Sequence, residues 1–129
     1  MIRINQFLKI VFHFINLSLI TLYLYPGSVF GYILYGNFEK QPKISADFFI
    51  ISSNHFYAFM ILSISGFLAH LNKNKINLLI IYLIALSIVL ELLQIIIPNR
   101  TFQFTDLIGN IMGVLIVCFF FIILNKIRF

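Results

Sequence analysis

The amino-acid sequence predicts an all-α integral membrane protein, because its composition is too apolar for a soluble domain and its apolar residues form long segments. Hydrophobic residues make up 61% of the chain and charged residues 10%, against about 45–50% and about 25% in soluble proteins. The mean hydropathy is +1.03. So few charges cannot cover a water-soluble domain of 129 residues. A disordered chain would need low hydrophobicity and high charge, so disorder is excluded too.

Four apolar segments predict four transmembrane helices, since roughly 20 apolar residues cross about 30 Å of hydrocarbon. The expected helices cover residues 10–25, 48–71, 78–97 and 107–124. In the same order, they are closed by Pro26-Gly27, Asn72-Lys73-Asn74-Lys75, Pro98-Asn99 and Asn125-Lys126. Proline interrupts a helix, and the Asn/Lys clusters require water. We therefore expect a single domain over residues 1–129, folded as an antiparallel bundle of four helices.

The distribution of Lys and Arg predicts the orientation of the bundle, because short cytoplasmic loops carry an excess of these residues. With the N-terminus inside, the inner side holds Arg3, Lys9, Lys73, Lys75, Lys126 and Arg128, and the outer side holds Lys40, Lys43 and Arg100. This excess of six over three predicts that both termini lie in the cytoplasm. The net charge of +5 then reflects this bias and attraction to anionic lipid, not nucleic-acid binding.

The first segment predicts where four tyrosines lie and whether the segment is cleaved. Tyr23 and Tyr25 lie at its outer end, and Tyr32 and Tyr35 follow closely. Aromatic rings with a polar group favour the headgroup layer, so we expect all four tyrosines there. The segment lacks a small-x-small cleavage site, and we expect it to remain in the mature chain rather than to be removed as a signal peptide.

Several polar side chains lie inside the predicted spans, where an ionisable group costs about 2.5–3.5 kcal/mol at the helix centre. Glu91 lies about 9 Å from the outer end of the third segment, and Gln94 shares its helical face. His55 lies about 10 Å deep in the second segment, and Asn110 about 5 Å deep in the fourth. Because lipid offers no hydrogen-bond partner, we expect these side chains to face one another.

Asp106 and Arg100 lie just above this level, at the start of the fourth segment and in the loop before it. As structural roles, we expect Asp106 to cap the fourth helix and Arg100 to pair with a carboxylate of the group. Asp106, Asn110 and Gly113 share one helical face. Gly109 and Gly113 form a small-x-x-x-small pair, which permits close approach of another helix.

The run from Glu91 to Gly113 resembles the signature of the VanZ-like family. That signature pairs E-x-x-Q at the end of one helix with P-x-R-[ST] and then D-x-x-x-N-x-x-G at the start of the next, and the order and spacing match here. His55, followed by Phe56 and Phe59, resembles the family's H-F-x-x-[FY] segment. The resemblance implies a small multi-pass protein of the bacterial cytoplasmic membrane. The family's namesake is associated with resistance to teicoplanin, a glycopeptide antibiotic.

The first functional hypothesis is an outer-leaflet site that binds or modifies a cell-envelope lipid, either an anionic lipid or a polyprenyl-linked precursor. Glu91 would be the acid, base or ligand, and His55 its proton partner, because imidazole titrates near neutral pH. The candidate ligand-binding residues are Arg100, Gln94, Asp106, Asn110 and Thr101. The guanidinium fork of Arg100 suits phosphate or carboxylate. We expect no cofactor, and no ligand spacing supports a metal ion on Glu91, His55 and Asp106.

Two other hypotheses stay open. In the second, the protein is a non-enzymatic accessory protein whose polar cluster ties four helices into a scaffold for a partner. In the third, it is a transporter, although four helices without visible inverted repeats argue against this. The sequence leaves open whether the protein is an enzyme, what its substrate is and how many copies assemble.

Overall fold

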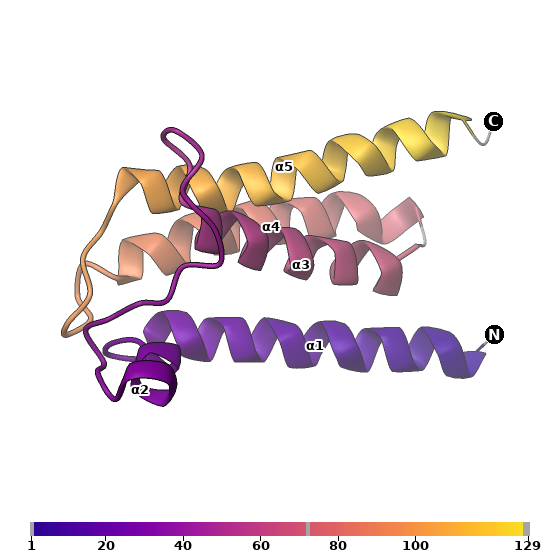
Figure 1. The fold of residues 1–129 in the computed structure, drawn as a ribbon. Helices are drawn as coiled ribbons and strands as arrows, with labels where there is room; N and C mark the ends of the chain where they lie inside the picture. The colour runs from indigo at the N-terminus through magenta and orange to yellow at the C-terminus, as the bar shows by residue number, and fades with distance from the viewer. Residues whose placement is uncertain (1, 72, 128–129) are drawn as a thin grey trace.

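The computed structural model describes residues 2–71 and 73–127, and within them the chain folds into five helices (Figure 1). These are α1 (Ile2–Leu24), α2 (Val29–Tyr35), α3 (Ser53–Ala69), α4 (Lys73–Leu93) and α5 (Phe104–Ile127). The described residues contain no β-strand, only an isolated antiparallel bridge between Phe48 and Ile51. The prediction of an all-α fold is confirmed.

The four long helices run alternately along the molecule, so that the start of α1 and the end of α5 lie at the same end (Figure 1). The short helix α2 lies at the opposite end, beside the end of α1. The most extensive helix contact joins α3 and α5, while α1 packs on α3 and α4 packs on α5. The C-terminal ends of α1 and α4 therefore meet the N-terminal ends of α3 and α5.

Among the described residues, three helical stretches are long and apolar enough to cross a membrane: Arg3–Leu24, Lys75–Leu93 and Phe104–Lys126. This finding supports a helical membrane protein with several spans. Helix α3 has 17 residues and is about 26 Å long at 1.5 Å per residue, slightly less than the hydrocarbon thickness of about 30 Å. Four spans and cytoplasmic termini thus stay predictions, and Arg128, counted on the inner side, lies outside the described residues.

Two of the expected helix boundaries are wrong at the ends nearest the outer loops. Helix α3 begins at Ser53 rather than at residue 48, because a tight turn closed by the Phe48–Ile51 bridge precedes it, with Phe49 at a positive φ of 56°. Helix α4 ends at Leu93 rather than at residue 97. Short i to i+3 hydrogen bonds wind residues 94–96 into a tight turn, since the approaching Pro98 disfavours helical backbone before it.

Other boundaries extend beyond the apolar segments. Helix α1 begins at Ile2 rather than at residue 10, and α5 covers residues 104–127 rather than 107–124. Helix α4 begins at Lys73, within the cluster expected to form a loop. Asn72 in that cluster lies outside the described residues. Polar residues end the apolar run but continue a helix when no proline or glycine interrupts them, so hydrophobicity alone misplaces these ends.

Two glycines on α5 set how closely it packs against α3. A Cβ atom on Gly113 would lie 2.5 Å from the carbonyl oxygen of Phe56, and one on Gly109 would lie 2.8 Å from that of Ser52. No side chain fits at these distances, so the glycines allow the two backbones to touch, as their spacing predicts. Large apolar side chains such as Phe14 and Leu17 face outward from the bundle, as expected for a surface that contacts lipid.

Candidate functional site

The four long helices bring buried polar side chains together at the end of the bundle opposite the termini. These side chains come from Tyr23 on α1, His55 on α3, Glu91 on α4, and Asp106 and Asn110 on α5. Glu91 and Asn110 are fully buried, and His55 and Tyr23 are only 7% and 8% exposed. The structure thus places His55, Glu91 and Asn110, which the sequence put at matching depth, side by side in one polar cluster.

Asn110 lies at the centre of the polar cluster and contacts all the other long helices. Its Oδ1 atom accepts a hydrogen bond from the Tyr23 hydroxyl at 2.6 Å and lies 3.1 Å from Nδ1 of His55. Its Nδ2 atom donates to the carbonyl oxygen of Ser87 at 3.2 Å and to Oε2 of Glu91 at 3.4 Å. One amide therefore joins α1, α3 and α4 to α5.

The imidazole of His55 lies between two carboxylates. Its Nε2 atom is 3.4 Å from Oδ2 of Asp106, and its Nδ1 atom is 3.6 Å from Oε2 of Glu91. The Asn110 amide turns its Oδ1 atom toward Nδ1 of His55, and the Tyr23 hydroxyl lies 2.9 Å from the same nitrogen. The Nδ2 group of Asn110 faces two acceptors, which supports this orientation of the amide.

Glu91 has polar partners on both oxygens. Its Oε1 atom accepts the backbone N–H of Gln103 at 3.3 Å, and its Oε2 atom accepts the Asn110 amide. Among the side chains that the structure describes, no Lys or Arg forms a salt bridge with Glu91 or Asp106. Among the described residues, His55 thus has the only basic nitrogen atoms within 4.0 Å of these two carboxylates.

Arg100 contacts backbone rather than a carboxylate, so the expected ion pair with Glu91 or Asp106 is wrong. Its Nε atom donates to the carbonyl oxygen of Tyr25 at 3.1 Å, and one terminal nitrogen donates to those of Leu22 and Gly27 at 2.9 and 2.7 Å. The last carbonyl groups of a helix have no partner within it, so the guanidinium satisfies the end of α1. Partial burial lowers the pKa of the Arg100 guanidinium, which stays charged.

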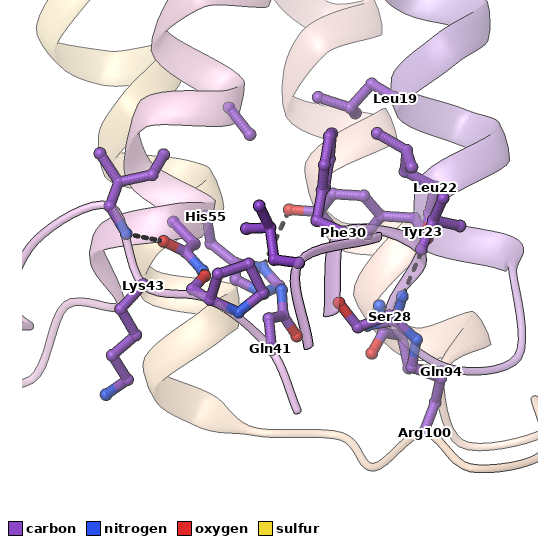
Figure 2. Close-up of a pocket in the computed structure, with 16 residues that line it drawn as sticks. Leu19, Leu22, Tyr23, Ser28, Phe30, Gln41, Lys43, His55, Gln94 and Arg100 are labelled. Atoms are coloured by element: carbon purple, nitrogen blue, oxygen red, sulfur yellow. Dashed lines mark hydrogen bonds between the residues drawn. The ribbon is translucent and has the colours of Figure 1, made fainter. Parts of the chain in front are cut away.

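A cavity of about 470 Å³ adjoins the polar cluster and shares Tyr23 and His55 with it (Figure 2). Its lining residues are Leu19, Leu22, Tyr23, Ser28, Val29, Phe30, Leu34, Gln41, Pro42, Lys43, Ile44, Asn54, His55, Ala58, Gln94 and Arg100. Figure 2 shows Leu19 and Leu22 on one side of the cavity and Gln94 and Arg100 on the other. The cavity is therefore lined by both apolar and polar side chains, and Arg100 donates a hydrogen bond to the carbonyl oxygen of Leu22.

The other predicted site residues lie in different places. Gln94 is only 3% exposed and lines the cavity, and its side-chain amide makes none of the hydrogen bonds found among the described residues. Asp106 lies in the first turn of α5, which begins at Phe104, so the expectation that it caps this helix is wrong. Thr101 is exposed and belongs to neither the cavity nor the polar cluster.

Tyr23 is a functional candidate that the sequence interpretation missed. It was expected in the headgroup layer, but its ring is buried and its hydroxyl contacts both Asn110 and His55. A signal for this position exists in the sequence, because Phe12, Asn16, Leu19 and Tyr23 recur at helical spacing on one face of α1. That face is turned toward α3, whereas the preference of tyrosine for the membrane interface predicts a position in the headgroup layer.

The fold and the polar cluster together define a helical membrane protein with several spans that gathers ionisable side chains at one end of its bundle. A family model described as VanZ/LLP1 matches residues 3–125. The chain therefore belongs to the VanZ/LLP1 family, which confirms the resemblance carried by the run from Glu91 to Gly113. No curated protein and no solved structure matches the chain significantly.

Proposed function

We propose that this protein binds an amphipathic, anionic ligand of the cell envelope in the cavity beside His55. The candidate ligands are an anionic lipid and a polyprenyl-linked precursor. The observation that carries the proposal is the mixed lining of the cavity, which combines the polar side chains of Gln94 and Arg100 (the polar wall) with the apolar side chains of Leu19 and Leu22 (the apolar wall). A volume of about 470 Å³ lies within the range of small-molecule sites.

The polar wall supplies donors for an anionic headgroup. Gln94 lines the cavity, and its amide makes no hydrogen bond among the described residues, which leaves its donors and acceptor for a ligand. Arg100 uses Nε and one terminal nitrogen on backbone carbonyls, which leaves the donors of its other terminal nitrogen for a ligand. Lys43 lines the cavity too, but its amine bonds Asp47 at 2.6 Å and extends away from the cavity in Figure 2.

The apolar wall supplies a surface for a lipid chain. The apolar lining comes from three helices: Leu19 and Leu22 on α1, Phe30 and Leu34 on α2, and Ala58 on α3. Burying a methylene group against such side chains is worth about 0.8 kcal/mol relative to water. A ligand with both an anionic headgroup and a hydrocarbon chain fits this mixed lining better than a wholly polar solute.

The proposal includes the membrane arrangement. Four spans with both termini in the cytoplasm would place the cavity at the outer leaflet of a bacterial cytoplasmic membrane. Helix α2 exposes Phe30, Tyr32 and Ile33, which suits a helix lying at the membrane interface. Reporter fusions test this orientation: a fusion at Lys40 should be active only outside the membrane, and a fusion at Lys75 only inside.

Two variants test ligand binding directly. Gln94→Leu keeps the size of the side chain and removes the amide, and Gln6→Leu makes the same change on an exposed position of α1. The purified full-length protein would be titrated with phosphatidylglycerol, undecaprenyl phosphate or phosphatidylcholine, and binding followed by thermal stabilisation. We expect the anionic ligands alone to bind, and Gln94→Leu to weaken them about tenfold, because a hydrogen bond to a charged group is worth about 1.5–3 kcal/mol.

The scaffold hypothesis is the second candidate, and the Asn110 hydrogen bonds favour it because they tie α1, α3 and α4 to α5. Under this hypothesis no lipid class would bind better than another, and Gln94→Leu would behave like Gln6→Leu. Glu91→Gln separates any chemical role from binding. If Glu91 and His55 modify the ligand, this variant should retain binding while losing the cellular phenotype, including any change in teicoplanin susceptibility.

A further inference from the structure

We propose that His55, Glu91 and Asp106 form a binding site for a divalent transition-metal ion. Each of the three offers a ligand atom, and these atoms lie within 4.8 Å of one another. They come from α3, α4 and α5, so the spacing of these residues along the sequence does not indicate a metal site. The proposal does not depend on a lipid in the cavity, and the ion can bind whether or not that ligand does.

The hydrogen bonding of His55 leaves one ring nitrogen free to bind the ion. Nδ1 lies near two polar partners, the Tyr23 hydroxyl and Oδ1 of Asn110. In the neutral tautomer that carries its proton on Nδ1, the Nε2 atom has a lone pair for an ion. Nε2 lies 3.4 Å from Oδ2 of Asp106, so an ion between these two atoms would be bound by both. Two ligands at about 2.1 Å from a tetrahedral metal ion lie about 3.4 Å apart. The observed separation therefore fits an ion held by both atoms.

A divalent cation bound in this cluster would balance the charge of its two carboxylates. Glu91 is fully buried and the side chain of Asp106 is 16% exposed. No Lys or Arg in the described part of the chain pairs with either. Protonation of His55 would balance only one of the two carboxylates, whereas a divalent ion on a neutral imidazole balances both. Uncompensated charge at such positions is strongly destabilising.

The surroundings of the three residues resemble the outer shell of metal sites. A metal-bound histidine normally donates its other ring N–H to a neighbour, and metal-bound carboxylates accept hydrogen bonds. Here Oδ1 of Asn110 lies 3.1 Å from Nδ1 of His55 and its Nδ2 donates to Oε2 of Glu91, while the Gln103 backbone N–H donates to Oε1. One imidazole with two carboxylates suits Zn²⁺ or Mn²⁺, because Mg²⁺ and Ca²⁺ prefer oxygen ligands alone.

The test is metal binding by the full-length protein, purified in detergent without a polyhistidine tag and treated with a chelator. Zn²⁺ or Mn²⁺ would be added, excess ion removed, and bound metal counted by mass spectrometry. We expect one ion per chain. His55→Ala and Asp106→Asn should each weaken binding more than about tenfold, since even outer-shell changes cost 10–100-fold. The matched controls His13→Ala and Asp47→Asn change exposed residues and should bind as the unchanged protein does.

A second measurement keeps the proposal testable if a variant does not fold. X-ray absorption at the zinc edge of the unchanged protein should show one imidazole and oxygen ligands. A spectrum without imidazole would overturn the proposal. Metal retention by the unchanged protein no greater than that of a variant with both His55→Ala and Asp106→Asn would also overturn it, and is the result expected if protons alone balance the cluster. Equal losses in the control variants would also overturn it, because they would place the ion elsewhere.

Discussion

The hydroxyl group of Tyr23 donates a hydrogen bond to Oδ1 of Asn110 at 2.6 Å, joining two residues that lie 87 positions apart. The same hydroxyl lies 2.9 Å from Nδ1 of His55. This contact fastens the first long helix to the last one at the point where the cavity meets the polar cluster. The phenol therefore has both a structural role and a place in the wall of the proposed ligand site.

Replacement of this hydroxyl should weaken the bundle. Tyr23→Phe removes the donor to Asn110 and keeps the ring contacts, so we expect the free energy of unfolding to fall by about 0.5–1.5 kcal/mol. Unfolding of the purified protein in mixed micelles would measure the change. Tyr32→Phe is the control, since Tyr32 is exposed and stacks on Phe38 through its ring. An equal effect of both substitutions would contradict the structural role of the Tyr23 hydroxyl.

Most of the polar cluster could be predicted from the sequence, whereas the role of Tyr23 could not. Glu91, His55 and Asn110 have no favourable partner in lipid, so their depth alone predicts that they meet. Tyr23 is compatible with both the headgroup layer and the interior, and only the packing of α1 on α3 decides between them. Hydrophobic periodicity along α1 favours a buried Tyr23. The prediction from sequence instead followed the preference of tyrosine for the membrane interface.

The contact between α3 and α5 leads to a second prediction. Gly113→Ala would place a methyl group 2.5 Å from the carbonyl oxygen of Phe56, so the helices would have to separate. We expect a loss of about 1–3 kcal/mol, typical of overpacking, seen as a lower melting temperature. The control Met112→Ala lies on the exposed side of α5 and should change stability little. A neutral Gly113→Ala would show that α5 does not approach α3 this closely.

Arg100 gives a third prediction, which follows from its three carbonyl partners. Arg100→Lys retains the charge but loses the planar fork that reaches Leu22, Tyr25 and Gly27 together. We expect the end of α1 to fray, with faster hydrogen exchange of residues 22–28 and a loss of about 1–3 kcal/mol. Arg3→Lys on an exposed position is the matched control. Unchanged exchange at residues 22–28 in Arg100→Lys would contradict the capping role.

The turn before α3 gives a prediction about pH. Hydrogen bonds from the Lys43 amine and the Ser53 backbone N–H lower the pKa of the exposed Asp47 carboxyl below its ordinary value. A group whose pKa is lower in the folded state stabilises it above the unfolded pKa, about 3.9 for Asp. This contribution is lost as pH falls through the folded value.

The effect of Asp47 should be small, because the pair is exposed. We expect Asp47→Asn to lower the melting temperature slightly at pH 6, with the difference from the unchanged protein disappearing at strongly acidic pH. Melting curves recorded across this range would measure it, and Glu39→Gln serves as an exposed acidic control. A difference that grows on acidification would contradict the sign of the pKa shift.

The cavity and the partners of Arg100 could not be read from the sequence. The sequence predicts an ion pair between Arg100 and a carboxylate, because the charges of side chains can be read from a sequence. The unpaired carbonyl groups at the end of a helix cannot. The cavity depends on where α2 and residues 41–44 lie over α1 and α3, and short loops carry little signal for such placement. The sequence therefore predicted the chemistry of the buried cluster better than the shape of the space beside it.

Photo-cross-linking tests the central claim, an anionic amphiphile in the cavity, most directly. A phosphatidylglycerol with a photoactivatable group on its acyl chain would be irradiated with the full-length protein in nanodiscs, and the attachment sites mapped by mass spectrometry. We predict attachment at Leu19 or Leu22, and none there with the matching phosphatidylcholine. Attachment of both lipids only to outward-facing residues such as Phe14 and Leu17 would contradict it.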